Sequence, residues 1–359
     1  MVGRRLARGV FVLAWACLAG CGGTAGDGTT RGPGAGNEAK ASKIVKFVGF
    51  DASEALVRAM KEGKIEGLVV QNPYRMGQLA VRTLVDHLEG RKVEPQVSTG
   101  ETLATPETMD QPEIKALLNP PKEGSSGPST VSASKAKKWR IMVIPKGTTH
   151  EFWQSIHAGA VKAATDLGNV ELIWQGPQKE SERDKQIELL QNAVASRVDG
   201  VALAPLDAEA LVRPVEEVIE RGIAVVIFDS ALGATKPTAK PISYVATDNY
   251  HGGVLAARRL GEVLKGEGKI ILLRYAVNSE STEKREQGFI DTMAKEFPKI
   301  TYLSQDQYAG ATADTAQKKA ESLIARYRGK VDGIFCCNES SAFGMLRALD
   351  AAGMVKGRP

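Results

Sequence analysis

Short apolar runs rich in Val, Ile and Leu alternate with longer amphipathic stretches along most of the chain. This alternation is typical of βαβ units on a parallel sheet. The stretch 73–89 shows the helical pattern, because it opens on Pro73, keeps its apolar residues on one stripe and stops at Gly90. Ten segments have the pattern of a strand, and this number favours two sheets over one. The predicted strands are 44–49, 67–71, 139–145, 170–174, 200–204, 223–228, 242–246, 269–274, 300–304 and 332–337.

One segment interrupts the alternation. Residues 119–138 read NPPKEGSSGPSTVSASKAKK, which is rich in Pro, Gly and Ser and has no periodic apolar positions. Such a composition is typical of a linker. We therefore expect two blocks, 43–118 and 139–359, joined by this linker.

The amino terminus has the layout of a signal peptide. Arginines precede a short apolar run, 10–19, which ends in Leu-Ala-Gly-Cys at Cys21. The run is too short to span a bilayer, which needs about 20 apolar residues. Leu-Ala-Gly-Cys resembles the bacterial lipobox, which implies lipidation of Cys21 after removal of the signal peptide 1–20. An ordinary cleaved signal peptide or a core helix are the alternatives. Residues 21–42 contain little that can be buried, so we expect a flexible tether.

Composition argues against several classes of function. The net charge of +5 includes the arginines of the signal peptide, and no cluster of Lys and Arg interleaves with aromatics, so a nucleic-acid partner is not expected. Cys336 and Cys337 lie in an apolar run and are expected to pack as small hydrophobes. The four His residues have no metal-ligand spacing, and we expect no metal.

The second block resembles the type I periplasmic sugar-binding proteins, the family of the ribose- and galactose-binding proteins. The segments that carry the resemblance are KWRIMVIPKGTTHEFWQSIHAGAVKAATDLG, VDGVALAPLDAEAL, GIAVVIFDSAL, SYVATDNYHGG, STEKREQGF and VDGIFCCNESSAFGMLRAL. The resemblance implies two Rossmann-like α/β lobes, each a parallel sheet flanked by helices, that hinge shut on a ligand. It implies no cofactor and no catalytic residue.

The first block resembles the carboxyl-terminal part of sequences of the same family. KIVKFVGFDASEALVRAMKEGKIEGLVVQNPYRMGQLAVRTLVDHLEG, at 43–90, matches the last strands and helix, whereas the second block stops where those strands are expected. The order is therefore a circular permutation of the usual one. We expect the first lobe to hold 139–246 with the helix 73–90. The expected second lobe holds 248–359 with 44–71 and 100–118.

Eight residues match ligand contacts of that family. Phe152 and Trp153 match the aromatic pair that stacks on the sugar ring, and Asp229 matches a carboxylate that accepts from its hydroxyls. The other implied contacts are Asp51, Gln71, His150, Arg285 and Asn338.

Each of these residues has a structural alternative. The aromatic pair can belong to the core, and Asp51 and Asp229 can be helix N-caps. Arg285 can form a surface or interlobe salt bridge, and His150 can lie in a solvated loop.

Two departures bear on the ligand. Ala204 and Ser230 replace an Asn and an Arg of the ribose-binding branch, so ribose itself is doubtful. Lys146, Glu151, Glu283 and Thr312 are candidates to substitute for these contacts, which leaves a charged or substituted sugar open.

The sequence thus predicts a monomeric substrate-binding lipoprotein on the periplasmic side of a membrane, anchored through Cys21, that delivers a small polar ligand to an ABC-type permease. A ligand sensor for a membrane receptor is the main alternative. An enzyme is less favoured, because the phosphate-loop, dinucleotide and nucleophile-elbow motifs are absent from the sequence. A sugar-responsive repressor is disfavoured by the lipobox and by the lack of a basic helix-turn-helix pattern.

Overall fold

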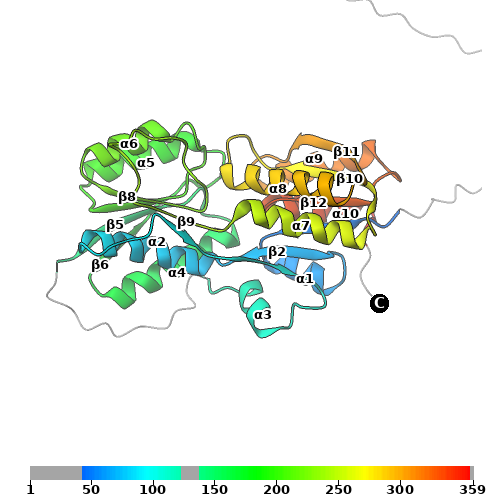
Figure 1. Cartoon of the computed structure of the whole chain (residues 1–359), viewed down its shortest axis with the longest axis horizontal. Coiled ribbons are helices and arrows are strands. Elements are labelled where there is room, and N and C mark those ends of the chain that lie inside the picture. Colours follow the sequence, from blue (N-terminus) through cyan, green and yellow to red (C-terminus); the bar gives the residue numbers. More distant parts are fainter. Residues whose placement is uncertain (1–42, 123–136, 356–359) are drawn as a thin grey trace, which may run out of the picture. The chain divides into compact units, whose positions relative to one another are not determined.

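The protein is built on two six-stranded sheets, seen in a computed structural model that describes residues 43–122 and 137–355 (Figure 1). The first lobe is built on the sheet with strand order β3-β9-β8-β7-β5-β6, and the second lobe on the sheet with order β11-β10-β12-β1-β2-β4. The predicted two-lobed α/β class is confirmed. Cys21 and most of the linker lie outside the described residues.

The first-lobe sheet is parallel throughout. Its strands are β3 (Gln96–Ser98), β5 (Trp139–Ile144), β6 (Val170–Trp174), β7 (Gly200–Leu203), β8 (Ala224–Phe228) and β9 (Ser243–Ala246). Its helices are α2 (Pro73–Leu88), α4 (Glu151–Leu167), α5 (Arg183–Ala195) and α6 (Val212–Glu220).

The second-lobe sheet is parallel except at one edge, where β4 runs antiparallel to β2. Its strands are β1 (Lys46–Phe50), β2 (Gly67–Gln71), β4 (Glu101–Ala104), β10 (Glu267–Arg274), β11 (Lys299–Tyr308) and β12 (Gly333–Cys336). Its helices are α1 (Glu54–Lys61), α3 (Pro112–Leu118), α7 (Asn249–Val263), α8 (Glu280–Glu296), α9 (Ala313–Arg326) and α10 (Glu339–Ala351). Every predicted strand overlaps an observed one, while the short strands β3 and β4 were not predicted.

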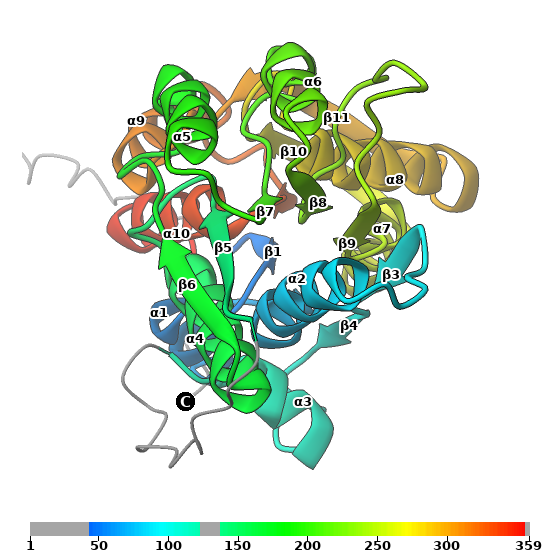
Figure 2. The ribbon, with the colours of Figure 1, turned by 90° about the vertical axis from the view of Figure 1, so that its left-hand side faces the viewer.

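Each sheet carries apolar layers on both faces. In the first lobe, α2 and α4 pack on one face and α5 and α6 on the other (Figure 2). In the second lobe, α7 and α8 cover one face, while α1, α3, α9 and α10 cover the other. Burial of both faces explains why the strands read as continuous apolar runs instead of alternating patterns.

Glycines let the paired helices approach closely in both lobes. A Cβ atom at Gly77 of α2 would lie 2.0 Å from a carbonyl oxygen of α4, and one at Gly159 of α4 would lie 1.9 Å from a carbonyl oxygen of α2. The pair α7 and α8 repeats this arrangement. A Cβ atom at Gly253 of α7 would lie 2.0 Å from a carbonyl oxygen of α8, and one at Gly288 of α8 would lie 2.1 Å from a carbonyl oxygen of α7. Any side chain at these positions would therefore force the two helices apart.

The described chain crosses between the lobes after β2, between β3 and β4, and after β9. One residue from each crossing joins a buried hydrogen-bonded cluster. The Thr247 hydroxyl donates to Oε1 of Gln71, at 2.8 Å, and its oxygen lies 3.2 Å from the hydroxyl of Thr99. The three crossings therefore form a connected hinge, directly behind the carboxyl ends of the strands.

Candidate functional site

Two aspartates mark the corresponding strand ends of the two lobes. Asp51 follows β1 and Asp229 follows β8, each after a buried phenylalanine. Both have left-handed backbone conformations, with φ of 67° and 63°, and both donate their backbone N–H to the neighbouring strand, at 2.8 and 3.0 Å. Non-glycine residues rarely adopt this conformation, and such strain is concentrated at functional sites.

Neither aspartate is a helix N-cap. Ser53 caps α1, and no helix begins within ten residues of Asp229. Both carboxylates instead line one pocket between the lobes, where the strands of both sheets end. The free cavity of this pocket measures about 30 Å³, which is far below the range of about 300–1,000 Å³ of small-molecule sites. Side chains therefore occupy most of the space between the lobes at this point.

Asp229 forms a buried ion pair with Lys146. The Lys146 ammonium lies 3.1 Å from Oδ2 of Asp229, and both side chains are almost completely buried. The ammonium also donates to three hydroxyls, those of Ser230, Ser279 and Ser281, at 2.5, 3.3 and 3.2 Å. Ser279 and Ser281 belong to the second lobe, so this first-lobe lysine bridges the cleft. A buried charge needs this number of partners to offset its desolvation.

The aromatic pair lies at the first turn of α4. The Phe152 and Trp153 rings meet edge to face, with centroids 4.9 Å apart, and both line the pocket. Trp153 is only 2% exposed, and its Nε1–H donates to Oε1 of Glu180 at 2.7 Å. The core interpretation is therefore partly right, because both rings also belong to an apolar cluster of the first lobe.

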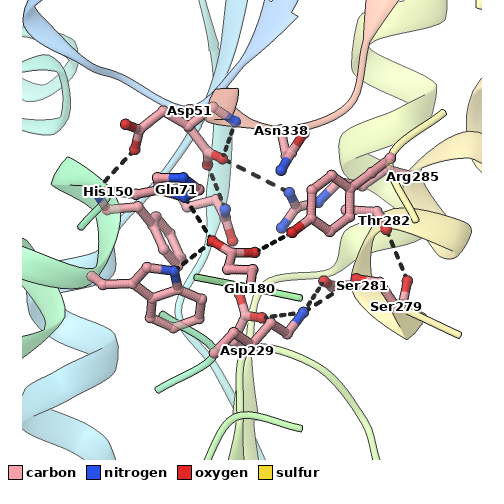
Figure 3. A pocket seen from close by; sticks show the side chains of 15 residues that line it. Asp51, Gln71, His150, Glu180, Asp229, Ser279, Ser281, Thr282, Arg285 and Asn338 are labelled. Atoms are coloured by element: carbon pink, nitrogen blue, oxygen red, sulfur yellow. Dashed lines mark hydrogen bonds and ion pairs between the residues drawn. The ribbon is translucent and has the colours of Figure 1, made fainter. Parts of the chain in front are cut away.

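Glu180 is the centre of a hydrogen-bonded network (Figure 3). Besides Trp153, its carboxylate contacts Nδ1 of His150 at 2.6 Å and accepts from the Tyr275 hydroxyl at 2.5 Å. Burial alone would raise the pKa of Glu180, but the adjacent His150 lowers it to about 2. Burial would lower the pKa of His150, but Glu180 raises it to about 9. The two side chains thus form an ion pair at neutral pH, and His150 is not a solvated loop residue.

Arg285 lies over the ring of Phe50. Its guanidinium carbon is 4.0 Å from the ring centroid, a cation–π contact. The same guanidinium donates to Oδ1 of Asn249 and to the Cys337 carbonyl, at 2.9 and 3.1 Å, and Nη1 lies 4.0 Å from Asp51. Arg285 is 2% exposed, so it is held inside the second lobe rather than on the surface.

Two amides complete the predicted set. Nε2 of Gln71 donates to Oδ1 of Asp51 at 2.6 Å, which links the hinge to the pocket. Asn338 caps α10, because its Oδ1 accepts from the backbone N–H of Ser341 at 3.2 Å. It also lines the pocket, so capping and pocket-lining coexist at this residue.

Two glutamates cap helices across the cleft. The Glu339 carboxylate, at the start of α10, accepts from the backbone N–H groups of Glu151 and Phe152, at 3.3 and 3.0 Å. The Glu151 carboxylate in turn accepts from the backbone N–H of Glu54, at the start of α1. Lys122 contacts Glu54 and Glu151, at 3.0 and 2.7 Å. Burial raises the pKa of Glu339 to about 7.

The structure brings all eight predicted contact residues to one pocket. Of the four candidate substitutes only Lys146 lines the pocket. Glu151 donates its backbone N–H to Glu339, Glu283 accepts from the backbone of Asn278, and Thr312 caps α9. Sequence reasoning missed several lining residues. A search at strand ends finds Tyr275, directly after β10, but no motif marks Glu180, six residues beyond β6. The missed residues are Glu180, Tyr275, Ser279, Ser281, Thr282 and Glu339.

Cys336 and Cys337 are buried free thiols, and burial raises the pKa of both. Within residues 43–122 and 137–355 there is no group of His, Cys, Asp and Glu that could hold a metal ion. Over the same ranges, no helix is long and apolar enough to cross a membrane.

Fold and site together define a class, a two-lobed α/β protein with a ligand cleft between hinged lobes. A family model described as the periplasmic binding protein domain matches residues 18–92 and 141–359. The chain belongs to this family.

Individual relatives share only about a third of their residues with this chain over the matched parts. The D-ribose/D-allose-binding protein of Pseudomonas aeruginosa is 28% identical over 232 residues, which are 63% of this chain and 70% of that protein. A solute-binding protein of Agrobacterium vitis with bound D-fucose is 34% identical with a TM-score of 0.56, covering 60% of this chain and 73% of that one. The periplasmic component of a sugar transport system from Hahella chejuensis is 33% identical with a TM-score of 0.55, covering 60% and 76%.

The ion pair of His150 and Glu180 predicts a pH dependence of stability. The pKa of His150 is about 9 in the folded protein against 6.5 when unfolded, so its contribution is complete below pH 6.5 and is lost between pH 6.5 and 9. The facing carboxylates are Glu180, Glu339 and Asp51. The pKa of Glu339 is raised from 4.5 to about 7, so its protonation changes the stability mainly below this pH window. We expect the wild-type melting temperature to fall from pH 6.5 to 9, and to fall less in His150→Gln.

Calorimetric melting curves across this range measure the effect. His87→Gln, at an exposed position near the end of α2, serves as the control and should follow the wild type. Parallel wild-type and His150→Gln profiles would contradict the assigned ion pair.

Proposed function

We propose that this protein captures a sugar between its two lobes and delivers it to an ABC-type permease. The observation that carries the proposal is the convergence of carboxylates, amides, an arginine and an aromatic pair from both lobes on one buried pocket. Such a set suits a ligand with many hydroxyls, which donate and accept at once, and a flat apolar face. Ribose and allose, for which one relative is named, and the fucose bound to another belong to this chemical class.

The contacts across the cleft support a hinged capture mechanism. Lys146 reaches Ser279 and Ser281, Tyr275 reaches Glu180, and Glu339 caps α4, so every one of these contacts joins opposite lobes. A ligand that contacts both lobes adds differential free energy to the closed form, which shifts the population toward it. Closure then presents a surface formed by both lobes to the permease. No catalytic role is proposed for any residue.

Family membership implies a periplasmic or extracellular location. We place the protein on the periplasmic side of the membrane, anchored by lipid on Cys21 and acting as a monomer. The sequence Leu-Ala-Gly-Cys after a short apolar run supports the anchor.

We also propose that the chain has the family fold in circularly permuted order. The family match falls in two segments, 18–92 and 141–359, on either side of the linker. β1 lies parallel to β12, and the Val45 backbone N–H donates to the Met354 carbonyl at 2.8 Å, so a direct connection from 355 to 43 needs little rearrangement. α2, from the first block, packs on α4 in the first lobe.

Asp229→Asn tests the binding site. Asn tolerates the left-handed backbone of this position but lacks the charge, so we expect at least a tenfold loss of affinity, the cost of about 1.4 kcal/mol. Thermal shift against pentoses, hexoses, polyols and sugar acids identifies the ligand of the wild type. Calorimetry with that ligand then measures the loss of affinity in Asp229→Asn. Asp248→Asn, at the exposed N-cap of α7, is the control. Binding of the best ligand unaltered in Asp229→Asn would refute the site.

Cys21→Ser tests the anchor. Without the thiol no lipid can be attached, so the protein should move from the membrane fraction to the soluble periplasmic fraction. Immunoblots of the two fractions measure the distribution, with the interior Cys337→Ser as the control that should stay with the membrane. A Cys21→Ser protein that remains membrane-bound although residues 1–20 have been removed would exclude lipidation at this residue.

A gene encoding 137–355 followed by 43–122 tests the permutation. Because both orders allow the same strand pairing, we expect the same far-ultraviolet circular dichroism spectrum, cooperative melting and the same ligand. An aggregated or non-cooperative product would count against the permuted assignment.

A further inference from the structure

A second pocket lies on the far side of the Glu180–Tyr275 contact. It has a volume of about 580 Å³ and takes its lining from both lobes, with residues 180–185 and 206–207 from the first and 275–277 and 311 from the second. We call it the outer pocket. Its size is within the range of about 300–1,000 Å³ that small-molecule sites occupy, whereas the inner cavity measures only about 30 Å³.

Glu180 and Tyr275 line both pockets and are hydrogen-bonded to each other at 2.5 Å. They form the wall between the two spaces. The bond joins the lobes, because Glu180 follows β6 and Tyr275 follows β10. A group lying between Glu180 and Tyr275 would therefore replace a contact between lobes, not one within either lobe, and would connect the inner and outer spaces.

The lining of the outer pocket suits a second polar ring. The Asp207 carboxylate accepts from the backbone N–H of Ala210 at 2.9 Å and lies 3.5 Å from the Arg183 guanidinium, which is half exposed. A carboxylate and a guanidinium side by side provide acceptors and paired donors for hydroxyls. Val277, 62% exposed, with Ala276 adds an apolar surface for a ring face.

We propose that the outer pocket is a second subsite and that the ligand is a disaccharide or another glycoside. One sugar unit occupies the inner pocket by the aromatic pair, and the glycosidic substituent passes between Glu180 and Tyr275 to Arg183 and Asp207. This inference rests on the proposed function and specifies its ligand class. Contacts in the outer pocket add to affinity only for ligands that have the second unit.

Titration calorimetry with matched sugars tests the subsite. The probes are D-glucose with maltose and trehalose, and D-galactose with lactose and melibiose. We expect at least one disaccharide to bind about tenfold tighter than its constituent monosaccharides, the gain from a hydrogen bond to a charged group. In Arg183→Ala this affinity ratio should fall toward one. Arg213→Ala, an exposed arginine of α6 paired with Glu217, is the matched control and should keep the ratio.

The outcomes separate the two proposals. Monosaccharides that bind as tightly as their disaccharides, or a ratio unchanged in Arg183→Ala, would overturn the outer subsite and leave sugar capture standing. No binding of any sugar, in a protein that melts cooperatively, would overturn sugar capture and the subsite with it.

Discussion

The site depends on the need to pair charges that are buried between two apolar lobes. An isolated ion in such a cleft would carry a large desolvation cost, so each is kept only with a partner. The pairs are Asp229 with Lys146, Glu180 with His150, and, at 4.0 Å, Asp51 with Arg285. The remaining carboxylate, Glu339, accepts from backbone N–H groups at the start of α4, which offset only part of the burial that raises its pKa to about 7. Removing one partner would therefore affect the whole cleft.

The same pairing links the pocket to the hinge. Asp51 accepts from Gln71, which accepts from Thr247, which contacts Thr99. Gln71, Thr247 and Thr99 belong to three different crossings between the lobes. The pocket carboxylate Asp51 is thus connected through hydrogen bonds to the segments that link the two lobes. The network also explains why little free space remains in the cleft, because polar groups of the two lobes form hydrogen bonds and ion pairs with one another there.

The two lobes repeat one local design. Asp51 and Asp229 have the same left-handed backbone at equivalent strand ends, and glycine-mediated helix packing recurs in α2 with α4 and in α7 with α8. In the first lobe this repeat is assembled from segments on either side of the linker, since α2 precedes it and α4 follows it. Packing depends on which surfaces match rather than on chain order, so a rearranged order is compatible with the same core.

The sequence by itself determined the element types, because buried parallel strands are continuous apolar runs. The two-lobed class and the eight pocket residues followed from the resemblance of its motifs to the periplasmic sugar-binding family. The short edge strands β3 and β4 escaped prediction, since three or four residues carry no periodicity. Only the tertiary structure decided that Glu180 joins His150 and Trp153 to Tyr275, and that Lys146 reaches across the cleft. These contacts join segments far apart in the chain, and their geometry depends on how the lobes face each other, for which no local pattern exists.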